Sequence, residues 1–252
     1  NKLLETHKGS TVQNLHNLFK IAVNAAVDEE IIPRNRFNKI IIPDDKLGDN
    51  FYTPSELVQF LKIAEKEENI TNYTAILLLA YSGLRKGEAF GLKWKDIDEL
   101  EETLVIERTR DGYGVRAPKT KNSYRSVIID EVVIKQLKLY KKWCRETKVK
   151  FGLPFNEDTY VFINRRTGVE VSAEILNHSL KRISERYEIK RISPHGLRHT
   201  HATILIQQRT PVKTIAERLG NTPDMIYKIY GHNFEELERE AVLDFGTALK
   251  VV

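Results

Sequence analysis

The feature that most constrains the fold of this chain is the segment YTAILLLAYSGLRKGEAFGL, residues 73–92. Up to Ser82 and Gly83 it is apolar on nearly every side of a helix, and a helix without a polar face must be surrounded by other parts of the protein. We therefore predict a buried central helix inside a large domain. The polar turn after it emerges where this helix ends, which gives Arg85 a rigidly anchored position.

The segment TLVIERTRDGYGVRAPKTKNSYRSVIID, residues 103–130, follows a different pattern. β-Branched residues alternate with polar ones and glycines indicate turns, which predicts a small antiparallel sheet with Lys119 in the loop of its last hairpin. Helical periodicity returns from Glu131 onward, interrupted by a short strand expected over residues 160–163. The predicted fold class is mainly α with a small antiparallel β-sheet, an α+β fold.

The chain divides into parts of different composition. Periodic apolar residues over 12–26 predict an amphipathic helix. The next segment, IIPRNRFNKIIIPDDKLGDN, has two prolines, a charge cluster and a glycine that interrupt regular structure, and a TPSE capping box then starts a new helix. We expect a small helical unit over residues 1–45, a linker over 46–52 and a main domain over 53–252. Because Asn1 directly precedes a helical pattern, we also expect a fragment of a longer protein.

Charge and cysteine content limit the classes of function. The chain has 40 Lys and Arg against 35 Asp and Glu, with a pI near 9.1, which makes a polyanionic partner plausible. The single cysteine, Cys144, excludes an internal disulfide framework and a multi-cysteine zinc site. No apolar run approaches the roughly 20 residues that cross a bilayer, and no leader pattern opens the chain. We expect a cytoplasmic protein without membrane association.

The segment SPHGLRHTH, residues 193–201, carries His195 and Arg198 three residues apart. On a helix that starts at the proline, both side chains project from one face, and the amides of a helix N-terminus also attract anions. This face therefore suits a phosphate group. Two alternatives stay open: a solvated basic helix end, and a zinc site of His195 and His199, although Gly196 stands where a zinc-protease helix carries its glutamate.

The segment TPVKTIAERLGNTPDMIYKIYGH, residues 210–232, predicts two short helices. Two Thr-Pro pairs suit N-cap and N1 positions, and two glycines suit the positions where helices stop. Tyr230 would lie at the end of the second helix beside Gly231, where a side chain can change direction. Tyr227 shares the same helical face.

Four segments in this order, SGLRKGE, APKTKNSYRSV, HGLRH and LGNTPDMIYKIYGH, resemble the four catalytic motifs of the tyrosine recombinases, the phage-integrase family. Each motif alone is weak, but four in order with suitable spacing are highly specific. The resemblance covers the catalytic domain, residues 51–250. Residues 1–45 are similar to the last part of the family's helical core DNA-binding domain.

The resemblance assigns the site residues motif by motif. It implies two arginines, an acidic residue that braces the first of them, a hairpin lysine, a histidine and a nucleophilic tyrosine. The expected site residues are Arg85, Lys119, His195, Arg198, Asn221 and Tyr230, with Glu88 in support. Asn221 departs from the histidine or tryptophan that the family usually has after LG; it can donate a hydrogen bond to a phosphoryl oxygen but carries no charge. Gly196 stands where the family often has an acidic residue.

The chemistry that this resemblance implies is DNA cleavage and rejoining through a 3′-phosphotyrosyl intermediate, without a metal ion, ATP or another cofactor. Forked guanidinium groups match the two non-bridging oxygens of a phosphate. A tyrosine phenol has a pKa of about 10 and needs help to lose its proton. Lys119 is the candidate acid for the leaving 5′ oxygen, and His195 is the candidate for proton exchange with Tyr230.

The resemblance also implies the partners. We expect double-stranded DNA recombination sites, a homotetramer on two duplexes and accessory DNA-bending or excision factors, in a bacterial integrase that moves a phage or transposon. The final segment, NFEELEREAVLDFGTALK, resembles the family's helix that docks on a neighbouring protomer. Packing within its own chain is the alternative for this helix.

Two other functions compete with this interpretation. Residues 212–231 also resemble a helix-turn-helix, which would make the chain a DNA-binding protein without catalysis. The second competitor is a phosphotyrosyl topoisomerase, which shares the chemistry but relaxes supercoils. The helix-turn-helix interpretation leaves SGLRKGE and HGLRH unexplained, and the style of PKTKNSYRSV favours an integrase over a topoisomerase by resemblance.

Overall fold

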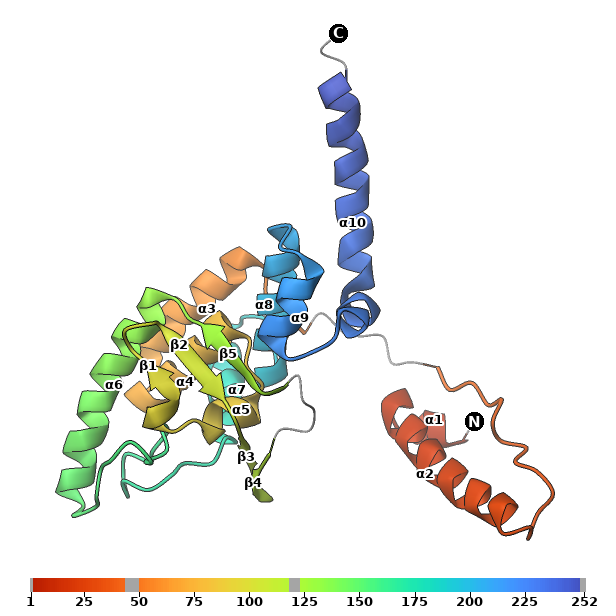
Figure 1. The fold of residues 1–252 in the computed structure, drawn as a ribbon, viewed down its shortest axis with the longest axis horizontal. Coiled ribbons are helices and arrows are strands. Elements are labelled where there is room, and N and C mark those ends of the chain that lie inside the picture. The colour runs from red at the N-terminus through yellow and green to blue at the C-terminus, as the bar shows by residue number, and fades with distance from the viewer. Residues whose placement is uncertain (1, 44–49, 118–122, 250–252) are drawn as a thin grey trace. The chain divides into compact units, whose positions relative to one another are not determined.

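The computed structural model describes residues 2–43, 50–117 and 123–249 (Figure 1). The chain divides into two compact units, Asn1–Asp49 and Asn50–Val252, called here the first unit and the second unit. In the first unit α1 (Lys2–Thr6) contacts α2 (Gly9–Asp28), the amphipathic helix that the sequence predicts. The segment after α2 folds back on this helix. The ring of Phe37 in that segment packs edge to face on the ring of Phe19 in α2, with centroids 4.9 Å apart.

The second unit is mainly helical with small antiparallel sheets, which confirms the predicted fold class. Its helices are α3 (Pro54–Glu67), α4 (Ile70–Ser82), α5 (Lys86–Gly91), the 3₁₀ helix η1 (Trp94–Asp96), α6 (Glu131–Lys150), α7 (Ile175–Tyr187), α8 (Pro194–Gln207), α9 (Val212–Leu219) and α10 (Pro223–Leu249). Its strands are β1 (Ile97–Asp98), β2 (Thr103–Ile106), β3 (Thr109–Asp111), β4 (Gly114–Arg116) and β5 (Arg125–Ile128).

Helix α4 is the buried central helix that the sequence predicts. It contacts α3, α5, α6, α7 and α8, so other helices surround it, and the side chains of Ile76, Leu78 and Leu79 are completely buried. The Asn69 side chain caps its start, and Gly83 ends it with φ +66°, a left-handed conformation that favours glycine. Arg85 follows at once. The main core is the apolar cluster around α4 and runs from Tyr52 to Leu197.

The strands form two sheets. One has the order β1-β2-β5 with antiparallel pairing, in which Leu104 faces Val127, and the other pairs β3 with β4 (Figure 1). The prediction of a strand over residues 160–163 is wrong. Tyr160 makes an isolated bridge to Lys93 and Ile163 makes one to Glu170, so this segment does not pair along its length with one neighbouring strand.

A second and smaller cluster, called here the small core, joins α8, α9 and α10. Its apolar residues include Ile206, Ile215, Leu219 and Ile226, and it also contains the ring of Tyr230. Helix α10 kinks at Tyr230, whose φ and ψ of −115° and 17° lie outside the helical range, and then continues to Leu249. The helical segment that starts at Pro223 therefore ends at Tyr230, beside Gly231, as the sequence predicts, and a second helical segment follows it directly in a new direction.

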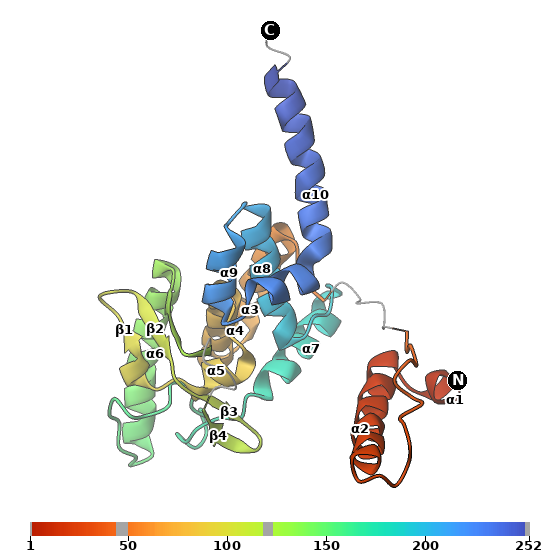
Figure 2. The same ribbon diagram turned by 45° about the vertical axis from the view of Figure 1, so that its right-hand side comes forward.

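Beyond the kink α10 extends away from α8 and α9 in two views of the molecule (Figures 1 and 2). The side chains of Val242, Leu243 and Phe245 are exposed on this outer part. Among the described helices, none combines the length and the apolar content needed to cross a membrane.

Candidate active site

Helix α8 presents the HGLRH segment from a firmly held start. The Ser193 side chain accepts a hydrogen bond from the Gly196 amide at 3.1 Å, and Pro194 occupies the first helical position, as the sequence predicts. Asn50 fixes the same turn from outside. Its Oδ1 accepts from the Ser193 amide at 2.8 Å, and its Nδ2 donates to Ser193 Oγ at 2.9 Å. His195, two residues after Ser193, is exposed, whereas Arg198 is buried.

The close approach of Asn50 gives a physical reason for the glycine at position 196. A Cβ added to Gly196 would lie 2.6 Å from the Asn50 carbonyl oxygen and 2.7 Å from Asn50 Oδ1. The contact with the carbonyl oxygen can be relieved only by movement of the backbone at Asn50. An acidic residue at position 196, which the family often has, would therefore require Asn50 to shift.

Arg198 joins two chain segments through its guanidinium. Nη1 donates to the Gly83 carbonyl at 2.9 Å, and Nη2 donates to the Leu219 carbonyl at 2.7 Å, so one side chain spans the ends of α4 and α9. Burial, together with the charge of Arg85, lowers the pKa of Arg198 to about 9. The guanidinium is still protonated near pH 7, and an anion bound beside it would offset the cost of keeping a charge there.

Arg85 and Glu88 form the opening of α5. The Glu88 carboxylate accepts from the Arg85 amide at 2.9 Å and from Arg85 Nη1 at 2.8 Å, and its other partner is Arg125 at 2.9 Å. Burial by itself would raise the pKa of Glu88, but the hydrogen bonds and charges of Arg125 and Arg85 hold it below the usual range. The carboxylate therefore stays ionised between two arginines. The side chain of Arg85 keeps 39% of its surface exposed, which leaves it accessible to a ligand.

Asn221 contacts the first arginine. Its Oδ1 accepts a hydrogen bond from Arg85 Nη2 at 2.7 Å, and the same nitrogen lies 3.3 Å from the Gly220 carbonyl. An asparagine side chain has an acceptor end and a donor end. Because the oxygen faces Arg85, the NH₂ group is the end that can donate to a phosphate oxygen.

The hydroxyl of Tyr230 is held by a residue of α8. Tyr230 Oη lies 2.8 Å from His199 Nδ1, and the ring centroids are 5.5 Å apart at 63°. Only 5% of Tyr230 is exposed, and this burial raises the pKa of its phenol to about 12, against the lowering effect of Arg198. Tyr227, by contrast, is exposed and packs on Phe234. The two tyrosines of the motif therefore occupy different environments.

His195 stacks edge to face on His199, with ring centroids 4.5 Å apart at 88°. Partial desolvation of the ring, the neighbouring His199 ring and the charges of Arg198 and Arg85 lower the pKa of His195 to about 4. Arg85 and Arg198 bond the adjacent carbonyls of Gly220 and Leu219, and His195 packs on the residue after Arg198, so the three residues share one site. Lys119 lies outside the described residues.

Three residues that contact the site residues are not predicted by the sequence to belong to the site. Arg125 pairs with Glu88, and its Nε donates to the Arg218 carbonyl at 2.8 Å. Arg218 in turn donates to the Tyr81 carbonyl at 3.0 Å. The sequence pattern indicates His199 only as a possible zinc ligand. The arginine in NSYRSV and that in AERLG carry no local signal, because their partners are distant in the chain.

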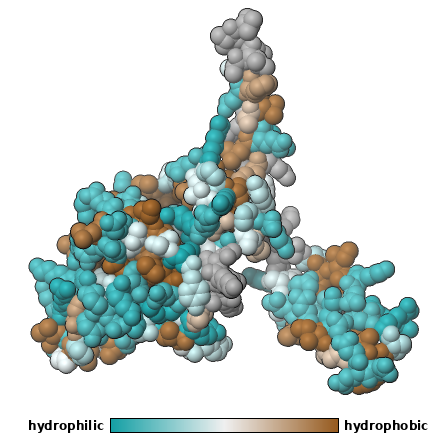
Figure 3. Space-filling view, viewed as in Figure 1, coloured by the Kyte–Doolittle hydropathy of each residue, from teal (hydrophilic) through white to brown (hydrophobic). Residues whose placement is uncertain are grey.

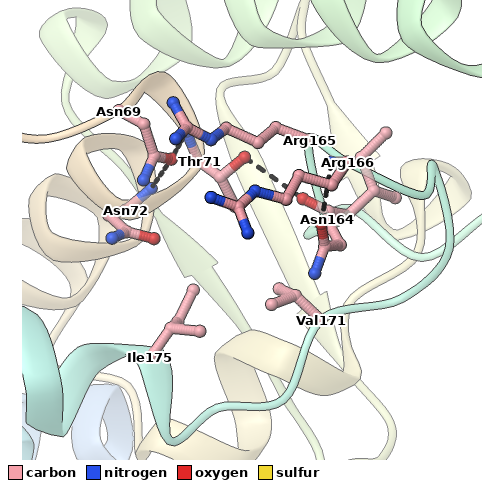
Figure 4. Close-up of a pocket in the computed structure, with 9 residues that line it drawn as sticks. Asn69, Thr71, Asn72, Asn164, Arg165, Arg166, Val171 and Ile175 are labelled. Carbon is pink, nitrogen blue, oxygen red and sulfur yellow. Dashed lines mark hydrogen bonds between the residues drawn. The ribbon is translucent and has the colours of Figure 1, made fainter.

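Two pockets lie in different parts of the second unit. One of about 500 Å³ adjoins the site and is lined by Tyr124, Arg125, Lys213, Ala216, Glu217, Asn221 and Pro223. The other, of about 250 Å³, lies at the start of α4, and Figure 4 shows Arg165 and Arg166 reaching toward that start. Arg85 follows the opposite end of this 13-residue helix, a length of about 20 Å. The second pocket therefore contains no predicted site residue.

The described residues contain no group of three or more His, Cys, Asp and Glu side chains arranged to hold a metal ion. What the fold brings together instead is a pair of guanidinium groups, because Arg85 and Arg198 donate to the adjacent carbonyls of Gly220 and Leu219. The buried phenol of Tyr230 lies close enough to Arg198 to be influenced by its charge. This defines the class of the site: it suits a phosphate diester and a tyrosine nucleophile.

The comparisons with known proteins agree with this class. Residues 50–236 match the phage integrase family. The chain is 35% identical to a "Tyrosine recombinase XerC-like" of Caldanaerobacter subterraneus, covering 96% of this chain and 67% of that protein. It is 30% identical to the "ICEBs1 integrase" of Bacillus subtilis, covering 94% of this chain and 66% of that protein. The chain thus spans about two thirds of the length of these relatives.

A solved structure shares the fold. The Tn1549 transposon integrase in complex with transposon right end DNA superposes with a TM-score of 0.79 at 22% identity, covering 95% of this chain and 82% of that one. The chain belongs to the phage integrase family. The resemblance to tyrosine recombinases that the four motifs predict is therefore confirmed.

Proposed function

We propose that this chain is the catalytic part of a site-specific recombinase that cleaves and rejoins DNA strands through a 3′-phosphotyrosyl link at Tyr230. The observation that carries the proposal is the buried phenol of Tyr230 in the same site as Arg85 and Arg198. A phenol alone is a weak nucleophile, and a cationic pocket alone is a binding site. Together they supply a nucleophile and the positive charges that stabilise the negative charge developing on the phosphate in the transition state.

In this mechanism the two arginines bind the non-bridging oxygens of the scissile phosphate. Arg198 is fixed by two backbone carbonyls, and Arg85 by Glu88 and Asn221, so both donors are oriented before the DNA arrives. Pre-oriented donors of this kind stabilise a transition state without reorganisation. The NH₂ group of Asn221 adds one neutral donor in place of the ring that the family usually has there.

In the cleavage step the tyrosine replaces the 5′ oxygen on the phosphorus. Tyr230 Oη attacks phosphorus, the bond to the 5′ oxygen breaks, and a free 5′ hydroxyl and a phosphotyrosine remain. Lys119 is proposed as the acid that protonates the 5′ oxygen, and His195 as a neutral ring beside the phosphate that helps to move protons. Attack by a 5′ hydroxyl from a partner duplex reverses the step and restores the tyrosine without ATP.

The proposed substrate is a double-stranded DNA recombination site, and the proposed role is integration and excision of a phage or transposon in the bacterial cytoplasm. The relatives support this, because they include the integrase of Staphylococcus phage L54a and the transposase from transposon Tn916. Residues 1–45 are proposed to be the last part of a core DNA-binding domain, 46–52 a linker and 53–252 the catalytic domain. Accessory DNA-bending factors are further proposed partners.

A homotetramer on two duplexes is also part of the proposal. Its support is the outer part of α10, where Val242, Leu243 and Phe245 expose about two thirds or more of their surface, at 66%, 71% and 68%. Figure 3 shows apolar surface along this helix. Exposed apolar side chains in a row are typical of a surface that another protein covers, and a neighbouring protomer is the proposed partner.

Covalent trapping tests the function. The chain is incubated, with a chelator present, on a pool of nicked duplexes in which cleavage of the nicked strand close to its nick releases a short fragment. This fragment carries the 5′ hydroxyl away, so religation is prevented. Protein joined to DNA is then separated by denaturing electrophoresis, and the trapped DNA is sequenced. Tyr230→Phe and Tyr227→Phe form a matched pair, because both remove one hydroxyl and Tyr227 lies only three residues away.

We expect an adduct with the wild type and with Tyr227→Phe, and none with Tyr230→Phe. An adduct that persists in Tyr230→Phe would overturn the assignment of the nucleophile. DNA binding without an adduct on any sequence would contradict catalysis by this chain and favour a protein that only binds DNA.

A further inference from the structure

The proposed nucleophile has a hydrogen-bond partner that the four motifs do not assign. The Tyr230 hydroxyl lies 2.8 Å from Nδ1 of His199, which comes one turn after His195 on α8. The contact joins two elements, because Tyr230 marks the kink of α10. The phenol is therefore held at a defined place within the folded chain.

The environment of the pair sets where the proton lies. Burial first, and the charge of Arg198 second, lower the pKa of His199, which keeps its imidazole neutral near pH 7. Burial raises the pKa of Tyr230 to about 12, so the phenol stays protonated. A protonated phenol donates to a neutral ring nitrogen, and Nδ1 of His199 is then the acceptor.

His195 has a different position. Its ring is exposed and packs against the ring of His199, with centroids 4.5 Å apart at 88°. The hydrogen bond to the nucleophile that the structure gives is made by His199. The two histidines thus divide one face of α8, with His195 toward solvent and His199 toward the phenol.

We propose that His199 is a catalytic residue that holds Tyr230 in place and accepts its phenolic proton during DNA cleavage. The proposal rests on the function proposed above and deepens it. As the bond from Oη to phosphorus forms and the bond from phosphorus to the 5′ oxygen breaks, the proton moves from Oη to Nδ1. The 5′ oxygen takes its proton from a separate acid, and rejoining returns the first proton from Nδ1 to Oη.

The charges around the pair make this transfer depend on the substrate. The groups that face His199 are Arg198 and His195 from its own helix and Tyr230 from α10. Without an anion, the charge of Arg198 disfavours a second cation on the imidazole. A phosphate diester bound to the arginines brings a negative charge that favours the imidazolium. His199 therefore becomes a competent acceptor when DNA is bound.

The test separates proton acceptance from positioning. Single-turnover cleavage of the trapped DNA site is measured for the wild type, His199→Ala, His199→Gln and His195→Ala, each in the full 252-residue chain. The same set is made with a fluorinated tyrosine at position 230, whose more acidic phenol depends less on a base. DNA affinity and melting temperature of every variant report whether it folds and binds.

We expect His199→Ala and His199→Gln to cleave about 10²-fold more slowly or worse, because general acid–base contributions are of the order of 10²–10⁴-fold. Glutamine can still hydrogen-bond the phenol but cannot take its proton, so it does not restore the rate. Fluorinated tyrosine should recover about tenfold or more in both variants, while it changes the wild-type rate little.

Three outcomes would overturn the proposal while leaving the proposed function intact. The first is a rate within about threefold of the wild type in both His199 variants, which is far below the effect of a lost proton acceptor. The second is restoration by glutamine without any effect of fluorination, which reduces His199 to a positioning residue. The third is recovery by fluorination in His195→Ala alone, which assigns the proton to His195. Absence of a wild-type adduct contradicts the proposed function itself.

Discussion

The two apolar cores of the second unit are built differently, and the candidate site lies where they meet. The main core encloses α4 with contiguous apolar segments, and Arg85 follows the end of that helix. The small core is a few residues from α8, α9 and α10, and it holds the ring of Tyr230. The guanidinium pocket is therefore anchored on one core and the nucleophile on the other.

Polar contacts fix the position of the small core relative to the main core. We call these contacts the seam; four arginines make them, namely Arg85, Arg125, Arg198 and Arg218. Each reaches from one core to a backbone carbonyl or side chain on the other, at distances from 2.7 to 3.3 Å. Such bonds are directional, whereas apolar packing tolerates sliding. We therefore expect the seam to set the geometry of the site.

Breaking the charge balance of the seam should have the largest effect. In Glu88→Gln the partly exposed Arg85 and the buried Arg125 lose their shared, buried carboxylate. Removing one partner of a buried ion pair costs about 3–5 kcal/mol, and we expect a loss of stability of that order, together with loss of the trapped adduct. Urea unfolding measures the stability.

The control for this variant is Glu185→Gln on α7, whose carboxylate is exposed and 3.7 Å from Lys181. Exposed pairs contribute about 0–1 kcal/mol, so this change should have little effect. Equal losses of stability in the two variants would contradict a special role for the seam.

Arg198→Lys should separate geometry from charge. A lysine keeps the positive charge, but its single nitrogen cannot bond both the Gly83 and Leu219 carbonyls and a phosphate oxygen in the same fixed plane. We expect the cleavage rate to fall by about 10²–10³-fold, as when one pre-oriented donor is removed. Single-turnover trapping measures the rate. Arg186→Lys, an exposed arginine on α7, is the matched control, and a similar loss there would argue for a general effect.

The features that the sequence predicts are those set by residues close together in the chain. The central helix was predictable because a run such as AILLLA has no polar face, and the start of α8 was predictable because Ser193 and Pro194 act within one turn. The helix end at Tyr230 was predictable because Gly231 follows it, although a second helical segment continues directly from this kink. Local signals therefore identify helices, and their ends where the deciding residues lie within one turn.

The contacts of the seam were not predictable for a physical reason. Asn50 and Ser193 are 143 positions apart, and Arg198 and Gly83 are 115 apart, so no local pattern records their pairing. The motif resemblance supplied Arg85, Arg198 and Tyr230 as site residues, but not the contact of His199. A hydrogen bond between two helices depends on how they pack, and that information is spread over both cores.

The pH dependence of stability tests a smaller part of the seam. His201 Nδ1 lies 3.0 Å from the Ala80 carbonyl, so Nε2 is the acceptor for Arg218 Nε at 2.9 Å. Burial and the charge of Arg218 lower the pKa of His201 to about 4, from the usual value of 6.5 for a histidine. Between these values the unfolded chain binds a proton that the folded chain does not, so stability falls as pH falls through this window.

We expect the slope from this residue to approach about 1.4 kcal/mol per pH unit. Urea unfolding between pH 7 and pH 5 measures it. His201→Gln keeps a donor and an acceptor but does not titrate, so the variant should lose less stability over this range than the wild type. Identical slopes in the two proteins would mean that His201 does not stay neutral in the folded state.

The smallest expected effect concerns two helical glycines that the comparison separates. Gly196 lies under Asn50 on the side of the main core, where a Cβ would meet a carbonyl oxygen at 2.6 Å, whereas Gly231 follows the kink with nothing within 4 Å of its Cβ position. Overpacking costs about 1–3 kcal/mol and the gain in helix propensity is about 1 kcal/mol, so Gly196→Ala should destabilise by roughly 1–2 kcal/mol. Gly231→Ala should stabilise by about 0.4–1 kcal/mol, because only the backbone entropy term remains. Urea unfolding measures both changes in stability. If Gly196→Ala destabilises and Gly231→Ala stabilises, the contact with Asn50 is the reason for glycine at position 196. If both changes stabilise, Asn50 moves aside for a side chain at no cost.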